Sequence, residues 1–243
     1  MYEEALALLP VAFWPLNEQS GDYIDATGGG YDGALTLGAG SRAGTTIWDG
    51  GGYALDLDGS ATFAAVTHDA ALAANAFTVW AFFNADAKAG TLVNKGRADL
   101  TQYYQLGFSG AGLLIFDIST SVTGFSRVSI AAAAFDTGTN YLAAATYTSG
   151  TQTLSITNLN TGAVTTATPG TPTGTMVIST NNLGIGANFQ AAGSGSPTGF
   201  FNGRIGGAGY HNAVLTAAQI AALASRAHAV WTRTNHRRLQ YAQ

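Results

Sequence analysis

The chain has 243 residues, which is enough for one β-sandwich domain around a single core. Hydrophobic residues make up 47% and charged residues only 10%, and there are 32 glycines, no cysteine and a net charge of -4. This composition excludes disulfides and thiolate metal sites, and it predicts a turn-rich β-protein whose surface is covered mainly by uncharged polar residues.

The N-terminal segment MYEEALALLPVAFW carries two acidic residues where a secretory signal would carry basic ones, and Pro10 breaks its apolar stretch. We therefore expect no signal peptide. No apolar run reaches the roughly 20 residues that a membrane-spanning helix needs, so we expect no membrane insertion.

All 14 acidic residues lie between Glu3 and Asp136, whereas five of the 10 basic residues follow Asp136. This asymmetric charge distribution can orient a binding partner electrostatically, and the partner can be a second copy of the chain.

Short apolar segments between Gly-rich or Asn-rich turns predict antiparallel strands. In QTLSITN, Leu154 and Ile156 point to one face and the polar residues between them to the other, which is typical of a half-buried strand. The turn 160–162 then predicts a hairpin to a strand that begins at Val164. The segments that we interpret as strands are TFAAV, FTVWAFF, GTLVNKG, QYYQLGF, GLLIFDI, NYLAAATYT, QTLSITN and NLGIGAN.

The segment FTVWAFF is apolar on both faces, because Trp80 and Phe82 alternate with Phe77, Val79, Ala81 and Phe83. This pattern predicts a central strand that a loop or a terminal helix covers on its outer side. A protomer interface is the alternative interpretation.

Residues 168–175 and 191–199 are rich in Gly, Pro, Ser and Thr, and we expect them to be exposed loops.

One short helix is predicted near the C-terminus. Thr216 and Gln219 form a T-x-x-Q capping box, and Leu215 and Ile220 form a hydrophobic staple around it, so the helix should begin at Thr216. Its apolar stripe consists of Ile220, Leu223, Ala227 and Val230.

The chain divides into a domain over residues 1–230 and a basic, aromatic tail over residues 231–243. We interpret the tail as a docking arm, since disordered tails are poor in aromatic residues; a solvated terminus is the alternative. The docking residues are Trp231, Arg233, Arg237, Arg238 and Tyr241.

Catalytic motifs are absent from the sequence. Glycoside hydrolysis needs two carboxylates across a cleft, but no predicted strand carries a pair of glutamates. Asp56 and Asp58 end a strand with a polar face, directly before a turn at Gly59. No H-E-x-x-H, G-x-S-x-G or phosphate-loop motif occurs, and basic residues with aromatic neighbours are confined to the tail. We therefore expect neither an enzyme nor a nucleic-acid-binding protein, and a glycoside hydrolase is the least favoured function.

A cluster of three aspartates, Asp22, Asp25 and Asp32, lies in one loop near the N-terminus. Asp and Gly are the expected residues of tight turns, so turn formation is the favoured interpretation. A calcium site formed by the same oxygens is the alternative. We expect no other cofactor.

Several strings resemble the laminin-G-like, or concanavalin A-like, jelly-roll family: PVAFWPLNEQSGDYIDATGGGYDG, GGYALDLDGS, FTVWAFF, YLAAATYTSGTQTLSITNLNTG, LGIGA and FFNGRIGGAGYHNAVLTAAQIAAL. The resemblance implies an all-β, two-sheet antiparallel jelly-roll sandwich with one short C-terminal helix. Family members usually have an Asp-Glu pair after the Gly-x-Ile of the last strand, but here Gly206 and Gly207 follow Ile205. This departure argues against a family-type calcium site.

The opening PVAFWPLNEQSG also resembles those of bacteriophage virion proteins that carry such jelly rolls. Our leading hypothesis from the sequence is therefore a non-catalytic virion surface component, a capsid decoration or tail-associated protein that contacts other virion proteins and forms a homo-oligomer.

The alternative is a carbohydrate-binding module for a cell-surface glycan, in which exposed aromatic side chains stack on sugar rings. The residues expected to do this are Trp14, Trp48, Tyr53, Tyr103 and Tyr104.

Overall fold

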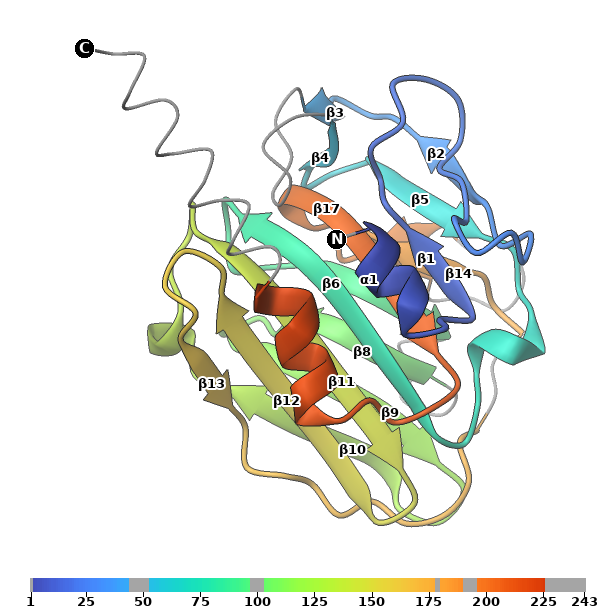
Figure 1. The fold of residues 1–243 in the computed structure, drawn as a ribbon, viewed down its shortest axis with the longest axis vertical. Coiled ribbons are helices and arrows are strands. Elements are labelled where there is room, and N and C mark those ends of the chain that lie inside the picture. Colours follow the sequence, from blue (N-terminus) through green and yellow to red (C-terminus); the bar gives the residue numbers. More distant parts are fainter. Residues whose placement is uncertain (1, 44–52, 97–102, 178–179, 190–195, 226–243) are drawn as a thin grey trace.

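The computed structural model describes residues 2–43, 53–96, 103–177, 180–189 and 196–225, and they form two stacked antiparallel sheets (Figure 1). This arrangement confirms the predicted all-β sandwich. Sheet A contains, in spatial order, β13 (Val164–Thr166), β12 (Thr151–Asn158), β11 (Asn140–Thr148), β6 (Phe77–Ala85), β17 (Asn202–His211), β4 (Ala54–Asp58) and β3 (Ser41–Ala43), with β1 (Ala12–Trp14) also paired to β17. Sheet B contains β10 (Gly124–Ile130), β9 (Leu114–Thr120), β8 (Tyr103–Phe108), β7 (Thr91–Gly96), β14 (Leu183–Ile185), β5 (Phe63–Val66) and β2 (Gly33–Thr36).

Smaller elements complete the described fold. The hairpin of β15 (Asn188–Phe189) and β16 (Pro197–Thr198) contacts β7 of sheet B. The short helices are α1 (Tyr2–Ala7), η1 (Ala70–Leu72) and η2 (Ala132–Ala134), and a C-terminal helix covers residues 217–225. In the part of the chain that the structure describes, no helix is both long and apolar enough to cross a membrane.

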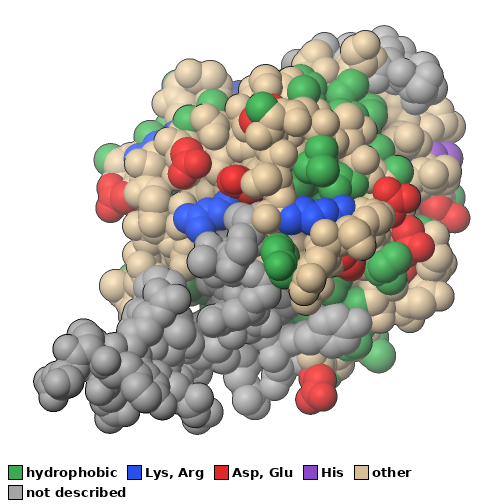
Figure 2. Space-filling view, turned by 90° about the horizontal axis from the view of Figure 1, so that it is seen from above, with side chains coloured by type: hydrophobic (Ala, Val, Ile, Leu, Met, Phe, Trp, Pro, Cys, Tyr) green, Lys and Arg blue, Asp and Glu red, His purple; other side chains and the backbone are tan. Residues whose placement is uncertain are grey.

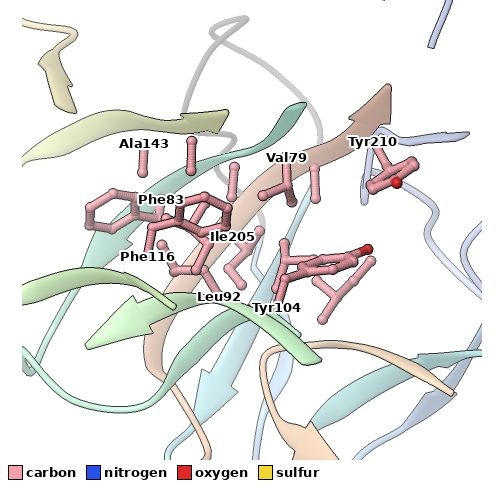
Figure 3. Close-up of a cluster of buried hydrophobic side chains, with 14 of the residues drawn as sticks. Val79, Phe83, Leu92, Tyr104, Phe116, Ala143, Ile205 and Tyr210 are labelled. Atoms are coloured by element: carbon pink, nitrogen blue, oxygen red, sulfur yellow. The ribbon is translucent and has the colours of Figure 1, made fainter. Parts of the chain in front are cut away.

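The main core lies between the two sheets (Figure 3). It is rich in aromatic rings: Phe77 alone packs against Tyr104, Tyr147 and Tyr210, with ring centroids 4.9, 5.7 and 5.6 Å away. Such tilted and stacked pairs contribute beyond the area that they bury. The 47% hydrophobic composition therefore supplies a packed interior without any disulfide.

The outer face of sheet A carries a second, smaller apolar cluster. Trp80 and Phe82 of β6 point to this face and are fully buried beneath α1 and the C-terminal helix, which lie on the near side of the sheet in Figure 1. The two-sided burial predicted for FTVWAFF is thus confirmed, with helices as the cover. A Cβ atom at Gly209, the cross-strand partner of Trp80, would collide with the indole ring, so glycine is required there.

Helix α1 was not predicted from the sequence. It has six residues and lies on the second cluster through Ala5, with Leu6 and Leu8 half-buried nearby. A helix this short is unstable alone, so contacts with the sheet rather than local propensity hold it.

The predicted hairpin after β12 is confirmed. Thr157 is the cross-strand partner of Val164, and the Asn158 side chain accepts hydrogen bonds from the amides of Asn160 (2.8 Å) and Thr161 (3.1 Å). Gly162 closes the turn with a φ of 76°.

The predicted capping box of the C-terminal helix is also confirmed. Thr216 Oγ1 accepts a hydrogen bond from the Gln219 amide (3.2 Å), and Gln219 Oε1 accepts one from the Thr216 amide (2.8 Å). Leu223 is buried in the second cluster and Ile220 packs against it. Residues 226–230 of the predicted stripe lie outside the described residues.

Replacing the cap should loosen this helix. We expect Thr216→Ala to lower the free energy of unfolding by about 1 kcal/mol, because an N-cap hydrogen bond is lost. Chemical denaturation measures this change. Ser225→Ala, at the other end of the same helix, is the control and should have a smaller effect.

Candidate functional site

Two of the aromatic residues expected to bind sugar lie in the core instead. Trp14 is fully buried and its Nε1–H donates to the carbonyl of Tyr31 (2.6 Å). Tyr104 is 1% exposed and its hydroxyl donates to the carbonyl of Leu72 (3.0 Å). Both side chains point between the sheets, so the expectation that they are exposed was wrong.

Of the other three predicted binding residues, the structure describes the side chain of Tyr53 alone. Tyr53 is half-buried directly before β4. Tyr103 begins β8, but its side chain falls outside the described part of the chain, as does Trp48. The predicted docking residues Trp231, Arg233, Arg237, Arg238 and Tyr241 also lie outside the described residues.

The three aspartates of the N-terminal loop bind backbone amides. Asp25 is 3% exposed, and its carboxylate accepts hydrogen bonds from the amides of Phe13 (3.1 Å), Thr27 (3.1 Å) and Gly29 (3.1 Å) and from the Thr27 hydroxyl. Asp32 accepts from the Asp25 amide (2.8 Å), and Asp22 accepts from the Leu35 amide (3.0 Å). These oxygens therefore hold the loop, as the favoured interpretation from the sequence predicts.

Asp58 has the same role at the end of β4. Its carboxylate accepts from the amides of Ser60, Ala61 and Thr62, each at 3.0 Å, and these hydrogen bonds hold the pKa of the carboxyl well below its usual range. Among the described residues, no three His, Cys, Asp or Glu side chains are grouped to hold a metal ion.

A buried lysine lies at one end of the core. Lys95 is 1% exposed, and its Nζ contacts His68 Nδ1 (2.9 Å) and the carbonyl of Asn181 (3.0 Å). Burial lowers the pKa of Lys95 to about 8 and also lowers the pKa of His68. The residue faces the core rather than solvent, so we do not place it in a ligand site.

The outer face of sheet B carries a line of polar side chains. The register makes Arg127 of β10 the partner of Asp117 of β9, Asp117 the partner of Gln105 of β8, and Gln105 the partner of Asn94 of β7. Their apolar neighbours along β8, β9 and β10 lie in the core, so these side chains point outward. We call these four residues the polar row.

The polar row has both buried and solvent-accessible members. Arg127 Nε and Nη2 each donate to Asp117 at 2.6 Å, a bidentate pair whose carboxylate is buried while the Arg127 side chain is 41% exposed. Gln105 is half-buried and Asn94 is fully buried. Arg127 also lies 5.3 Å from the ring of Phe125, which is 37% exposed. The accessible part of the row is therefore Arg127 and Gln105, with Phe125 beside them.

The hairpin β15–β16 borders the polar row. Asn188 Nδ2 donates to Gln105 Oε1 (3.0 Å), and the Phe189 amide donates to Asn94 Oδ1 (3.3 Å). Asn188 and Thr198 are cross-strand partners, and within the described structure the buried atoms Asn188 Oδ1 and Thr198 Oγ1 have no hydrogen-bond partner. Unsatisfied buried polar atoms are rare in folded proteins. Two of them on one cross-strand pair therefore make this hairpin a candidate for contact with a polar ligand.

No protein-family model and no curated protein sequence matches the chain. Among solved structures, domain 4 of the extracellular arabinanase AbnA from Geobacillus stearothermophilus, in complex with arabinotriose, is similar with 18% identity and a TM-score of 0.55, covering 88% of this chain and 98% of that one. The CBM40 of the Ruminococcus gnavus IT-sialidase, bound to alpha2,3 sialyllactose, has 14% identity and a TM-score of 0.50 and covers 63% and 83%.

Domains LG4-5 of the mouse laminin alpha1 chain are similar with 16% identity and a TM-score of 0.46, covering 63% of this chain and 39% of that one. At these identities the likenesses concern the fold. The chain therefore has the jelly-roll fold that its sequence resemblance implies.

Proposed function

We propose that this chain is a non-catalytic carbohydrate-binding domain and that it binds a glycan on the outer face of sheet B, at the accessible end of the polar row. The observation that carries the proposal is the alignment of Arg127 and Gln105 on one face, beside the hairpin whose Asn188 contacts Gln105. This function is the alternative from the sequence analysis, with a different set of residues.

The chemistry of this surface suits a sugar. Hydroxyl groups need both donors and acceptors, and a guanidinium beside an amide supplies several fixed donors together with an amide oxygen. Phe125 adds a partly exposed aromatic ring, and the amphipathic faces of sugar rings pack on such rings. Two proteins of similar fold, the AbnA domain and the sialidase CBM40, are described with bound oligosaccharides.

The buried members of the row act as supports in this proposal. Asp117 fixes the guanidinium of Arg127, and Asn94 holds β15 against β7. Arg127 and Gln105 are two strands apart, roughly 10 Å, so the ligand must be at least a disaccharide to contact both. The absence of catalysis in this proposal agrees with the pairing of Asp117 with Arg127, and with the binding of loop amides by Asp22 and Asp58.

Calorimetric titration with arabinotriose and with alpha2,3 sialyllactose, each with and without calcium, tests the proposal. We expect binding of at least one sugar, and Gln105→Ala should weaken it at least fivefold because a hydrogen-bonding amide is lost. Gln19→Ala, which removes an exposed glutamine from a distant loop, is the matched control and should leave the affinity unchanged. No binding of either sugar or of a wider glycan array, or equal effects of the two variants, would contradict the proposal.

The virion-surface hypothesis, with its virion partners and homo-oligomer, stays a prediction, because no observation on the described residues favours it. Among the described side chains that Figure 2 draws in colour, acidic and basic groups are scattered between uncharged ones rather than gathered into a patch of one charge.

A further inference from the structure

A second surface feature lies on the opposite side of the molecule from the polar row. A pocket of about 460 Å³ opens on the outer face of sheet A, beside the area that the helices cover. Its floor is formed by the outward side chains of β12, and its walls by β13 and by residues 214–221 around the start of the C-terminal helix. This volume lies within the range of roughly 300–1,000 Å³ that is typical of small-molecule sites.

The floor is rich in hydroxyl residues, yet several of these hydroxyls are occupied. Thr146 Oγ1 and Thr153 Oγ1 are hydrogen-bonded to each other across β11 and β12 at 2.6 Å. Ser155 Oγ donates to the carbonyl of Ala144 (3.4 Å). Because the hydroxyls of Thr146 and Thr153 bond to each other, the methyl groups of these two residues are left to contact a ligand.

Aliphatic side chains form the rest of the surface. Val164 on β13 and Val214 before the helix line the pocket and are 57% and 42% exposed, so together they form an apolar patch that is open to solvent. Ile220 and Ala221 of the helix form the facing wall. Every described residue that lines the pocket is uncharged and non-aromatic. A bound ion would therefore lose its hydration without gaining an oppositely charged partner, and a sugar would find no aromatic ring to stack on.

The geometry points to a binding site for a neutral aliphatic molecule in this pocket. Apolar contact with valine, isoleucine and threonine methyl groups supplies the affinity, and the absence of charge in the lining selects against ionised chains. This site is separate from the polar row and does not depend on the glycan proposal.

The test is an NMR titration of the whole chain with 1-octanol, octanoate and octylammonium. We expect 1-octanol to shift the amides of residues 153–157, 164–167 and 214–221, and to bind at least tenfold more tightly than either ion. Octanol shifts elsewhere, no binding, or equal binding of the ions would overturn the inference.

Two neighbouring alanines provide matched variants. Ala221 lines the pocket and Ala222 does not, and both are exposed on the same helix. We expect Ala221→Glu to weaken octanol binding at least tenfold, and Ala222→Glu and Gln105→Ala to leave it within twofold. If light scattering instead showed a dimer that Ala221→Glu dissociates, the occupant would be a second copy of the chain and the aliphatic ligand would be refuted.

Discussion

Replacement of Asp25 by alanine should lower the free energy of unfolding by about 4 kcal/mol, a loss large enough to threaten folding of the domain. The buried carboxylate accepts hydrogen bonds from four backbone amides and one hydroxyl, and it joins β1 to the loop that follows it. Without the carboxylate, the Phe13 amide is left buried without this acceptor, and charge-assisted hydrogen bonds are lost as well. Urea unfolding followed by circular dichroism measures the difference.

The neighbouring aspartate Asp22 provides the comparison. It is exposed and accepts a single hydrogen bond, from the Leu35 amide, so Asp22→Ala should cost less than about 1 kcal/mol. Asp25→Asn should be intermediate, because the amide keeps one acceptor oxygen but turns a donor toward the remaining N–H groups. Similar losses for the Asp25 and Asp22 variants would show that the loop is not held through Asp25.

Local patterns were sufficient to predict much of this fold. Alternation in QTLSITN gave the correct inward residues, Leu154 and Ile156, because one face of β12 meets the main core. The capping box at Thr216 was predictable because its hydrogen bonds join residues three positions apart. Helix α1 was missed because its stability comes from contacts with a sheet that is distant in sequence.

The binding residues were harder to predict, since exposure depends on which face of each strand meets the core. Trp14 and Tyr104 are aromatic residues in strands, and the sequence does not say that both point inward. The polar row has a usable signal in the sequence, because Gln105 and Asp117 each interrupt an apolar strand at an outward position. That they form one line depends on the register of β8, β9 and β10, which is a property of the assembled sheet.

Acid should weaken the domain through His211, which is 1% exposed at the end of β17. Its Nε2 accepts a hydrogen bond from Trp80 Nε1–H (3.1 Å), and burial lowers the pKa of the imidazole from 6.5 to about 4, although a backbone hydrogen bond with Leu8 opposes part of this change. Between these two pKa values the unfolded chain binds a proton that the folded chain does not, so the free energy of unfolding falls as the pH is lowered through this window.

We expect His211 to account for about 2 kcal/mol of the stability lost between pH 7 and pH 4.5. His211→Gln keeps an acceptor for the Trp80 N–H but cannot take up a proton in this range, so the loss on acidification should be smaller in the variant by that amount. Urea unfolding of both proteins at the two pH values gives the difference, and the contribution of the carboxylates cancels between them. An equal loss in the two proteins would mean that the pKa of His211 is the same in the folded and unfolded chains, so that burial beside Trp80 does not penalise the protonated imidazole.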